Sequence, residues 1–118
     1  MTNEVDPHSD ELKSRYLAGI EDDLRALRAS SAETAGDRRP VELDQQSVGR
    51  LSRMDAMQQQ AMASAQETRR NGRIRALEAA IHRIEAEEFG WCIDCGAFIG
   101  FRRLDVDPTA IRCRDCAT

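Results

Sequence analysis

Four cysteines constrain this chain of 118 residues more than any other feature. They form two C-x-x-C knuckles, with seventeen residues between the second and the third cysteine. Two knuckles at this separation are typical of a tetrahedral zinc site, because each tight turn places two thiolates on one side of the chain. Four thiolates complete the coordination shell, so the metal is expected to be structural and not catalytic. The sequence therefore predicts one Zn²⁺ per chain, bound by Cys92, Cys95, Cys113 and Cys116.

Two other uses of the cysteines fit the sequence less well. A pair of disulfides requires an oxidising compartment, and the acidic, polar N-terminal residues resemble no secretory signal. A redox-active C-x-x-C normally lies at a strand-to-helix junction of a thioredoxin-like fold, for which the chain has too few strand signals. No run of about 18 apolar residues is present that could span a membrane. We therefore expect a cytoplasmic protein whose thiols are reduced.

Composition limits both the core and the partners. Aromatic residues make up 4% and charged residues 32% of the chain, so a large globular core is improbable and order must come from helix pairing and the metal. The net charge is −4, and residues 89–118 balance four acidic with four basic residues. Because no segment offers an uncompensated basic face, we expect a protein partner and no direct DNA binding. We also expect a monomer.

Apolar residues at alternating spacings of three and four predict two helices that pair. The first helix begins at Ser9 and ends near residues 30–31. Its apolar positions are Leu17, Ile20, Leu24 and Leu27, and Leu12 and Tyr16 add to the same side. The second begins near Asp44 or Ser47 and continues to Gly90, and its later half has apolar positions Ile74, Leu77, Ile81 and Ile84. Its earlier half has a weaker apolar pattern, formed by Leu51, Met54, Met57, Ala61 and Ala65. Because the 23 residues from Leu51 to Ile74 are not a multiple of seven, a slip of the register is predicted at Asn71–Gly72.

The matching spacings predict an antiparallel coiled-coil hairpin. If Leu17 pairs with Ile84 and Leu27 with Ile74, the residue numbers of every pair add to 101, and the chain reverses near residues 50–51. The predicted fold is mainly α: a hairpin over residues 1–88, with its tip near 40–60, and a Cys₄ zinc finger over residues 89–118. Phe89, Trp91, Phe98 and Phe101 are expected to pack the finger onto the bases of the helices.

The finger sequence closely resembles that of the DksA/TraR family of transcription regulators. The resemblance is carried by the segment Phe89–Leu104, which reads FGWCIDCGAFIGFRRL, by Asp107–Ala110, and by the second knuckle. It implies a protein that binds RNA polymerase without binding DNA and inserts its coiled coil into the secondary channel. It further implies that the tip approaches the catalytic centre and that the alarmone ppGpp acts with the protein in the stringent response.

The tip residues are less clear, because the family motif D-x-x-D-x-A is absent. An ungapped alignment from the finger reaches Gly49–Met54, and the nearest acidic-then-small pair is Asp55–Ala56. Asp44, on the other side of the predicted turn, is the rival, although it is equally suited to capping a helix. We expect Asp55 and Ala56, or Asp44, to contact the polymerase active centre, and we favour Asp55. The plain alternative for Asp55 is a solvated surface charge.

A basic run on the second helix lies near where the family carries residues that meet polymerase and ppGpp. Its members are Arg69, Arg70, Arg73 and Arg75. The alternative is an ordinary solvated face with partners one helical turn away, such as Glu78.

Nothing in the sequence predicts an enzyme. It contains no Gly-rich phosphate loop and no Ser/His/Asp set, and the cysteines are assigned to the metal. Two rival functions remain open: a zinc-ribbon factor that binds DNA, and a coiled-coil adaptor in which zinc only closes one end.

Overall fold

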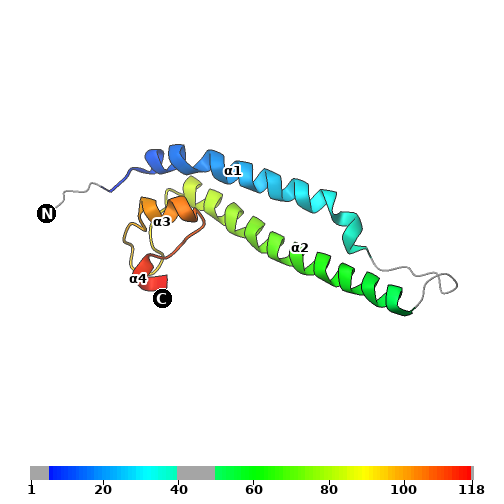
Figure 1. Ribbon diagram of the computed structural model, residues 1–118. Coiled ribbons are helices and arrows are strands. Elements are labelled where there is room, and N and C mark those ends of the chain that lie inside the picture. Colours follow the sequence, from blue (N-terminus) through cyan, green and yellow to red (C-terminus); the bar gives the residue numbers. More distant parts are fainter. Residues whose placement is uncertain (1–5, 40–49, 118) are drawn as a thin grey trace. The chain divides into compact units, whose positions relative to one another are not determined.

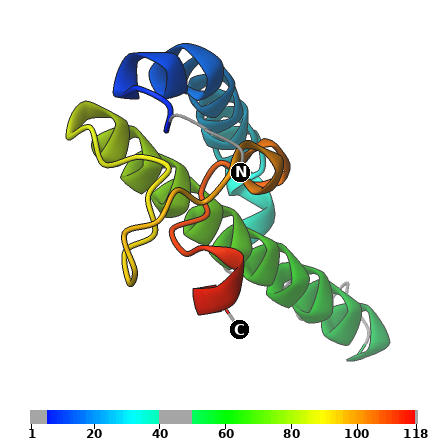
Figure 2. The same ribbon diagram turned by 90° about the vertical axis from the view of Figure 1, so that its left-hand side faces the viewer.

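The computed structural model describes residues 6–39 and 50–117, except for the side chains of residues 50 and 51. These residues form α1 (Ser9–Glu33), the 3₁₀ helix η1 (Ala35–Arg38), α2 (Arg50–Glu85), α3 (Phe101–Val106) and α4 (Arg114–Ala117) (Figure 1). A loop joins α3 to α4 (Figure 2), and the one β-contact in the described ranges is an isolated bridge between Trp91 and Phe98. The prediction of a mainly helical protein is confirmed. No described helix is long and apolar enough to cross a membrane.

The chain divides into two compact units that both draw on α1 and α2. Unit 1 consists of Met1–Leu24 and Arg75–Thr118, and unit 2 consists of Arg25–Ile74. This division differs from the predicted boundary after residue 88, which stays a prediction. The predicted start of the second helix at Asp44 or Ser47 lies outside the described residues.

Unit 1 contains the buried core, to which both helices and the finger contribute. Its four most completely buried large side chains are Leu12 and Ile20 from α1, Leu77 from α2 and Leu104 from α3. Burial of each such side chain stabilises the fold by about 1.5–3 kcal/mol. Further buried positions are Tyr16, Leu24, Ala80, Ile84, Phe89, Cys92 and Ile99. The finger therefore shares one core with the helix pair of this unit.

The predicted apolar positions of α1 all face inward. The most buried of them, Leu12, Tyr16, Ile20 and Leu24, are four residues apart, and Leu17 and Leu27 are half-buried. A step of four residues advances by about 400° around a helix, so steps of four turn the buried stripe gradually. This turn lets α1 direct Tyr16 toward Phe89, whose ring centroid lies 5.4 Å from that of Tyr16. The contact of Tyr16 with the finger is a feature that periodicity in α1 alone cannot reveal.

A charged cluster joins α1 to α3 of the finger. The hydroxyl of Tyr16 donates to a carboxylate oxygen of Asp105 at 2.7 Å, and the guanidinium of Arg15 donates to both carboxylate oxygens at 3.2 and 2.7 Å. The same guanidinium lies 4.5 Å above the ring of Phe101. Burial, and then the contact with Asp105, raise the pKa of Tyr16 to about 12. The expectation that finger aromatics pack onto the helices is confirmed for Phe89 and Phe101.

Inside the finger, the remaining aromatic rings pack on one another. The ring centroids of Trp91 and Phe98 are 5.5 Å apart, and those of Phe98 and Phe101 are 5.1 Å apart. Offset and edge contacts of this kind stabilise by about 0.5–1.5 kcal/mol beyond their area burial. Trp91 and Phe98 therefore pack against other rings of the finger, and the prediction that they also pack onto the helices stays a prediction.

Unit 2 is held together by polar side chains. Glu67 of α2 accepts a hydrogen bond from the Ser31 hydroxyl at 2.5 Å and ion pairs with Arg38 and Arg70, both at 2.8 Å. The hydrogen bond from Ser31 and then that from Arg70 hold the pKa of Glu67 below its usual value. Because all three partners converge on one carboxylate, the contact has a defined geometry that a stripe of apolar side chains would lack.

Two contacts between the helices of unit 2 fix their direction. Ser31 meets Glu67, whereas further along the chain the carbonyl oxygen of Arg39 accepts a hydrogen bond from Gln60 at 2.7 Å. Higher numbers on one side pair with lower numbers on the other, so the segments run antiparallel. Both contacts lie within about three residues of the predicted register.

Four of the five apolar positions predicted for the first half of α2 are wrong, and the side chain of the fifth, Leu51, lies outside the described residues. Met54 and Met57 are 51% and 55% exposed, and Ala61 and Ala65 are also exposed. The half-buried positions are instead Ala56, Gln60, Ala63, Glu67 and Arg70, and they continue the three-four spacing into Ile74, Leu77, Ile81 and Ile84 without a slip. α2 passes through Asn71–Gly72 unbroken. Polar residues occupy inward positions here because partners from the other segment satisfy them.

The end of α2 sets the entry to the finger. Glu87 adopts φ +60°, the Glu88 N–H donates to the Arg83 carbonyl at 2.8 Å, and the Glu87 N–H donates to the Ile84 carbonyl at 3.1 Å. This is the Schellman arrangement, in which glycine usually occupies the position with positive φ. The guanidinium of Arg83 then donates to the carbonyl oxygens of Glu88 at 3.0 Å and Trp91 at 2.7 Å. One arginine thus ties the helix end to the first residues of the finger.

Tyr16 offers a direct test of the α1–α3 contact because it is the one tyrosine of the chain. Its pKa, raised from 10.0 to about 12, means that the folded protein retains the phenolic proton longer than the unfolded chain does. This contribution to stability is complete below pH 10 and is lost as the pH rises toward 12. Near-ultraviolet absorbance should show Tyr16 ionising near 12 in the parent. In Asp105→Asn the midpoint should fall part of the way toward 10, whereas the control Asp107→Asn should leave it unchanged.

The strained position at the end of α2 generates a second prediction. A side chain with left-handed backbone geometry costs about 1–2 kcal/mol, which glycine relieves at the expense of greater freedom in the unfolded chain. Glu87→Gly should therefore raise the free energy of unfolding by up to about 1 kcal/mol, as measured in urea. Glu88→Gly, next to it and without positive φ, should lower it by about 0.4–1 kcal/mol. Equal effects of the two substitutions would contradict the assignment of strain to Glu87.

Candidate metal centre

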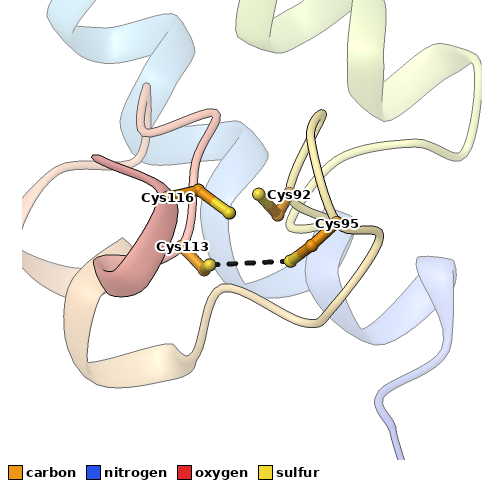
Figure 3. Close-up of side chains that lie close together, drawn as sticks. All are labelled: Cys92, Cys95, Cys113 and Cys116. Carbon is orange, nitrogen blue, oxygen red and sulfur yellow. Dashed lines mark hydrogen bonds between the residues drawn. The ribbon is translucent and has the colours of Figure 1, made fainter. Parts of the chain in front are cut away.

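The four predicted ligands lie together in the finger (Figure 3). All four sulfur atoms lie within 4.8 Å of one another, and the Cys95 and Cys113 sulfurs are 3.6 Å apart. The separation of that pair is far greater than the roughly 2.05 Å of a disulfide bond. It is close to the sulfur–sulfur distance of about 3.8 Å that a tetrahedron with zinc–sulfur bonds of about 2.3 Å requires. The residues present therefore fit a zinc ion.

Backbone hydrogen bonds shape the first knuckle. The Gly96 N–H donates to the Cys92 carbonyl at 2.9 Å, and the Cys92 N–H donates to the Ala97 carbonyl at 2.8 Å. Gly96 has φ +76°, as expected for a glycine that directly follows such a knuckle. The turn brings the Cys92 and Cys95 sulfurs to the same side of the loop (Figure 3).

Two contacts hold the second knuckle against the first. The Ile93 N–H donates to the Ile111 carbonyl at 2.9 Å, and the Arg112 guanidinium pairs with the Asp94 carboxylate at 2.8 Å. Each contact joins a residue inside the first knuckle to one just before the second. The two loops therefore face each other across the sulfur cluster with their backbones in fixed register.

The pKa shifts of the clustered thiols indicate that a bound cation would stabilise the site. Backbone N–H groups, first that of Cys113 and then that of Cys95, lower the pKa of Cys92 to about 6. In contrast, hydrogen bonds with the thiols of Cys113, Cys92 and Cys95 raise the pKa of Cys116. Cys92 therefore loses its proton readily, whereas the other three thiols oppose the deprotonation of Cys116. A bound divalent cation favours the thiolate form of every cysteine that coordinates it, Cys116 included.

The predicted tip residues occupy different environments. Asp55 is exposed on α2 near the start of the helix, and Ala56 is half-buried beside a hollow of about 360 Å³ lined by Asp37, Arg39, Gln60 and Met62. Asp44 lies outside the described residues. Asp55 and Ala56 belong to unit 2, whereas the cysteines belong to unit 1.

The four predicted basic residues are not equivalent. Arg69 and Arg75 are exposed, but Arg70 is half-buried in its pair with Glu67, and Arg73 is half-buried and has a partner within the protein. Arg69 and Arg75 are thus the members whose charge is presented to solvent. The sequence analysis missed the role of Arg70 in unit 2, because its partner Glu67 is itself bound by Ser31, 36 residues away in the sequence.

Comparison with known proteins identifies the finger. Residues 87–118 match the family model described as the prokaryotic dksA/traR C4-type zinc finger. The RNA polymerase-binding transcription factor DksA of Escherichia coli K12 is 47% identical over 45 residues, which are 38% of this chain and 30% of that protein. The corresponding protein of Haemophilus influenzae is 42% identical over 45 residues, 38% of this chain and 31% of the relative. The chain therefore aligns with less than a third of the length of these curated relatives.

A solved structure extends the similarity of fold beyond the finger. The structure of transcription factor DksA2 from Pseudomonas aeruginosa matches 92% of this chain and 79% of its own chain, with a TM-score of 0.68 and 20% sequence identity. This likeness confirms the predicted fold class, a helical hairpin with a C-terminal zinc finger. Together with the sulfur geometry, these similarities confirm the resemblance to the DksA/TraR family and identify residues 87–118 as a C4-type zinc finger of that family, with one structural zinc ion.

Proposed function

We propose that this protein binds RNA polymerase and regulates transcription initiation without chemistry of its own. The observation that carries the proposal is the finger, whose geometry and sequence match those of proteins named RNA polymerase-binding transcription factors. The finger also shares one core with the parts of α1 and α2 that belong to unit 1, so a partner that holds the finger would hold those parts as well. Copurification with core RNA polymerase is the first test, and the absence of a complex would overturn the proposal.

In this proposal, the paired helices enter the polymerase secondary channel and act there by contact. Unit 2 is suited to this role because α1 and α2 are joined inward by polar contacts, which leaves Asp55, Met54 and Met57 exposed to a partner. Methionine side chains adapt to irregular surfaces, and a carboxylate in a confined site interacts more strongly than one in bulk water. Such contacts would act on mobile elements of the polymerase near its active centre.

The alarmone ppGpp is proposed to act at the same interface. The support is the presence of exposed basic side chains on α2, of which Arg69 and Arg75 are the best candidates. Direct DNA binding is not part of the proposal, because the chain carries a net charge of −4. A protein that works on RNA polymerase in this way would act in the cytoplasm.

The proposed mechanism predicts that binding and regulation separate at the tip. If Asp55 acts within the channel while other surfaces provide most of the affinity, Asp55→Asn should leave the polymerase Kd within about twofold. Regulation of a ppGpp-sensitive promoter in purified transcription assays should nevertheless fall about tenfold, equivalent to about 1.4 kcal/mol. Asp44→Asn is the rival variant, and the larger defect identifies the tip residue.

Asp23→Asn provides the matched control, since it removes one exposed carboxylate from α1 and should change neither quantity. If both Asp55→Asn and Asp44→Asn regulated like the parent, the tip mechanism would not apply to this chain, although polymerase binding could still hold.

A further inference from the structure

The finger carries an apolar hollow with a basic rim. Its volume is about 430 Å³, and its lining includes Ile99, Val106 and Ala110 together with Arg102, Arg103 and Arg114. Val106, the last residue of α3, is 85% exposed although it borders this apolar surface. Exposed aliphatic side chains beside a hollow of this kind are typical of a surface that another molecule covers.

The acidic residues of the finger leave the basic rim largely uncompensated. Asp105 is engaged by Arg15 and Tyr16 of α1, and Asp94 is engaged by Arg112. The finger contains four acidic and four basic residues, and the Asp94–Arg112 pair accounts for one of each. Because Asp105 pairs with Arg15 outside the finger, two acidic residues remain against three basic ones. Its formal balance therefore hides a local excess of positive charge.

The residues that line the hollow show the same excess of positive charge. Asp107 is the one acidic residue that lines the hollow, and one of its carboxylate oxygens accepts hydrogen bonds from the backbone and hydroxyl of Thr109 at 3.0 and 2.7 Å. Among the described residues, no hydrogen bond or ion pair involves the side chain of Arg102 or that of Arg114. Arg103 uses its Nε to donate to the Arg112 carbonyl at 3.1 Å, which leaves its charge unpaired.

We propose that this hollow is a docking site for an acidic segment of the protein partner. An aliphatic or aromatic side chain of that segment would fill the hollow against Val106, and flanking carboxylates would pair with Arg102 and Arg114. Guanidinium groups bind carboxylates through two parallel hydrogen bonds, and an apolar anchor surrounded by such pairs is typical of the energetic centre of an interface. A phosphate backbone would gain nothing from the apolar floor, so a protein segment fits better than nucleic acid. The inference rests on RNA polymerase being the partner.

Charge reversal at the rim tests the site. Arg102→Glu, Arg114→Glu and Val106→Asp each oppose an acidic segment, and all three positions are exposed, so the finger should still fold. Each should weaken binding of core RNA polymerase at least about tenfold at low salt, an effect of about 1.4 kcal/mol. Lys13→Glu is the matched control, because it reverses an exposed charge on α1 of the same unit, and it should change the Kd by about twofold at most. One zinc per chain in every variant verifies the fold.

A photo-crosslinking amino acid at position 106 identifies the segment. In the complex with core RNA polymerase it should crosslink to a stretch that carries at least two carboxylates beside an apolar residue. The same group at position 93, on an exposed part of the first knuckle, should not mark that stretch. Crosslinks from position 106 to a basic or neutral stretch would overturn the proposal.

The remaining outcomes separate this site from the function on which it rests. If the parent binds polymerase and the three rim variants bind equally well, the docking site is wrong and the proposed function stands. If the parent does not bind polymerase, both the docking site and the proposed function are wrong. If the parent instead binds a 20-base-pair DNA duplex and Arg102→Glu abolishes that binding, the hollow serves nucleic acid, and the proposal of an acidic protein segment is overturned.

Discussion

Four thiolates around one divalent cation are the interaction on which the finger depends. Between Phe89 and Ala117 the described chain has two short helices and one isolated bridge, too little regular structure to hold two loops in register. Metal coordination supplies folding free energy directly in modules of this size. Once the knuckles are fixed, Leu104 and Ile99 are placed in the core of unit 1, and Asp105 is placed beside Tyr16 and Arg15. The metal therefore also organises the surroundings of α1.

The helix pair changes character along its length. In unit 1, Ile20, Leu24, Leu77 and Ile84 form a buried apolar contact, whereas unit 2 places Gln60, Glu67 and Arg70 at equivalent inward positions. An apolar contact tolerates small displacements, but a carboxylate shared by Ser31, Arg38 and Arg70 requires one arrangement. The polar half also leaves methionines exposed on the outside of α2. A segment that is internally fixed and externally adaptable is suited to contacts inside a confined channel.

The parts of the structure that the sequence predicted are those encoded locally. The zinc ligands could be predicted because the spacing of the cysteines within each knuckle is itself typical of a zinc site. The later half of α2 could be predicted because its apolar positions, Ile74, Leu77, Ile81 and Ile84, form an uninterrupted pattern. The first half of α2 could not be predicted, because Met54 and Met57 suggested an apolar seam. Its inward positions include the polar residues Gln60 and Glu67, which depend on partners more than twenty residues away. The contact of Tyr16 with Asp105 spans 89 residues and has no periodic signal at all.

Hydrogen exchange with and without zinc tests the central claim, that the metal orders the finger and, through it, the first part of α1. After chelation under reducing conditions, amides of residues 89–117 should exchange much faster. Those of Ser9–Leu24 should lose protection, because Asp105 no longer binds Tyr16 and Leu104 leaves the core in which Leu12 is buried. Residues 52–70 should change little, and zinc, but not magnesium, should restore the original pattern. Undiminished protection of the finger without zinc, or of Ser9–Leu24 while the finger unfolds, would contradict the account.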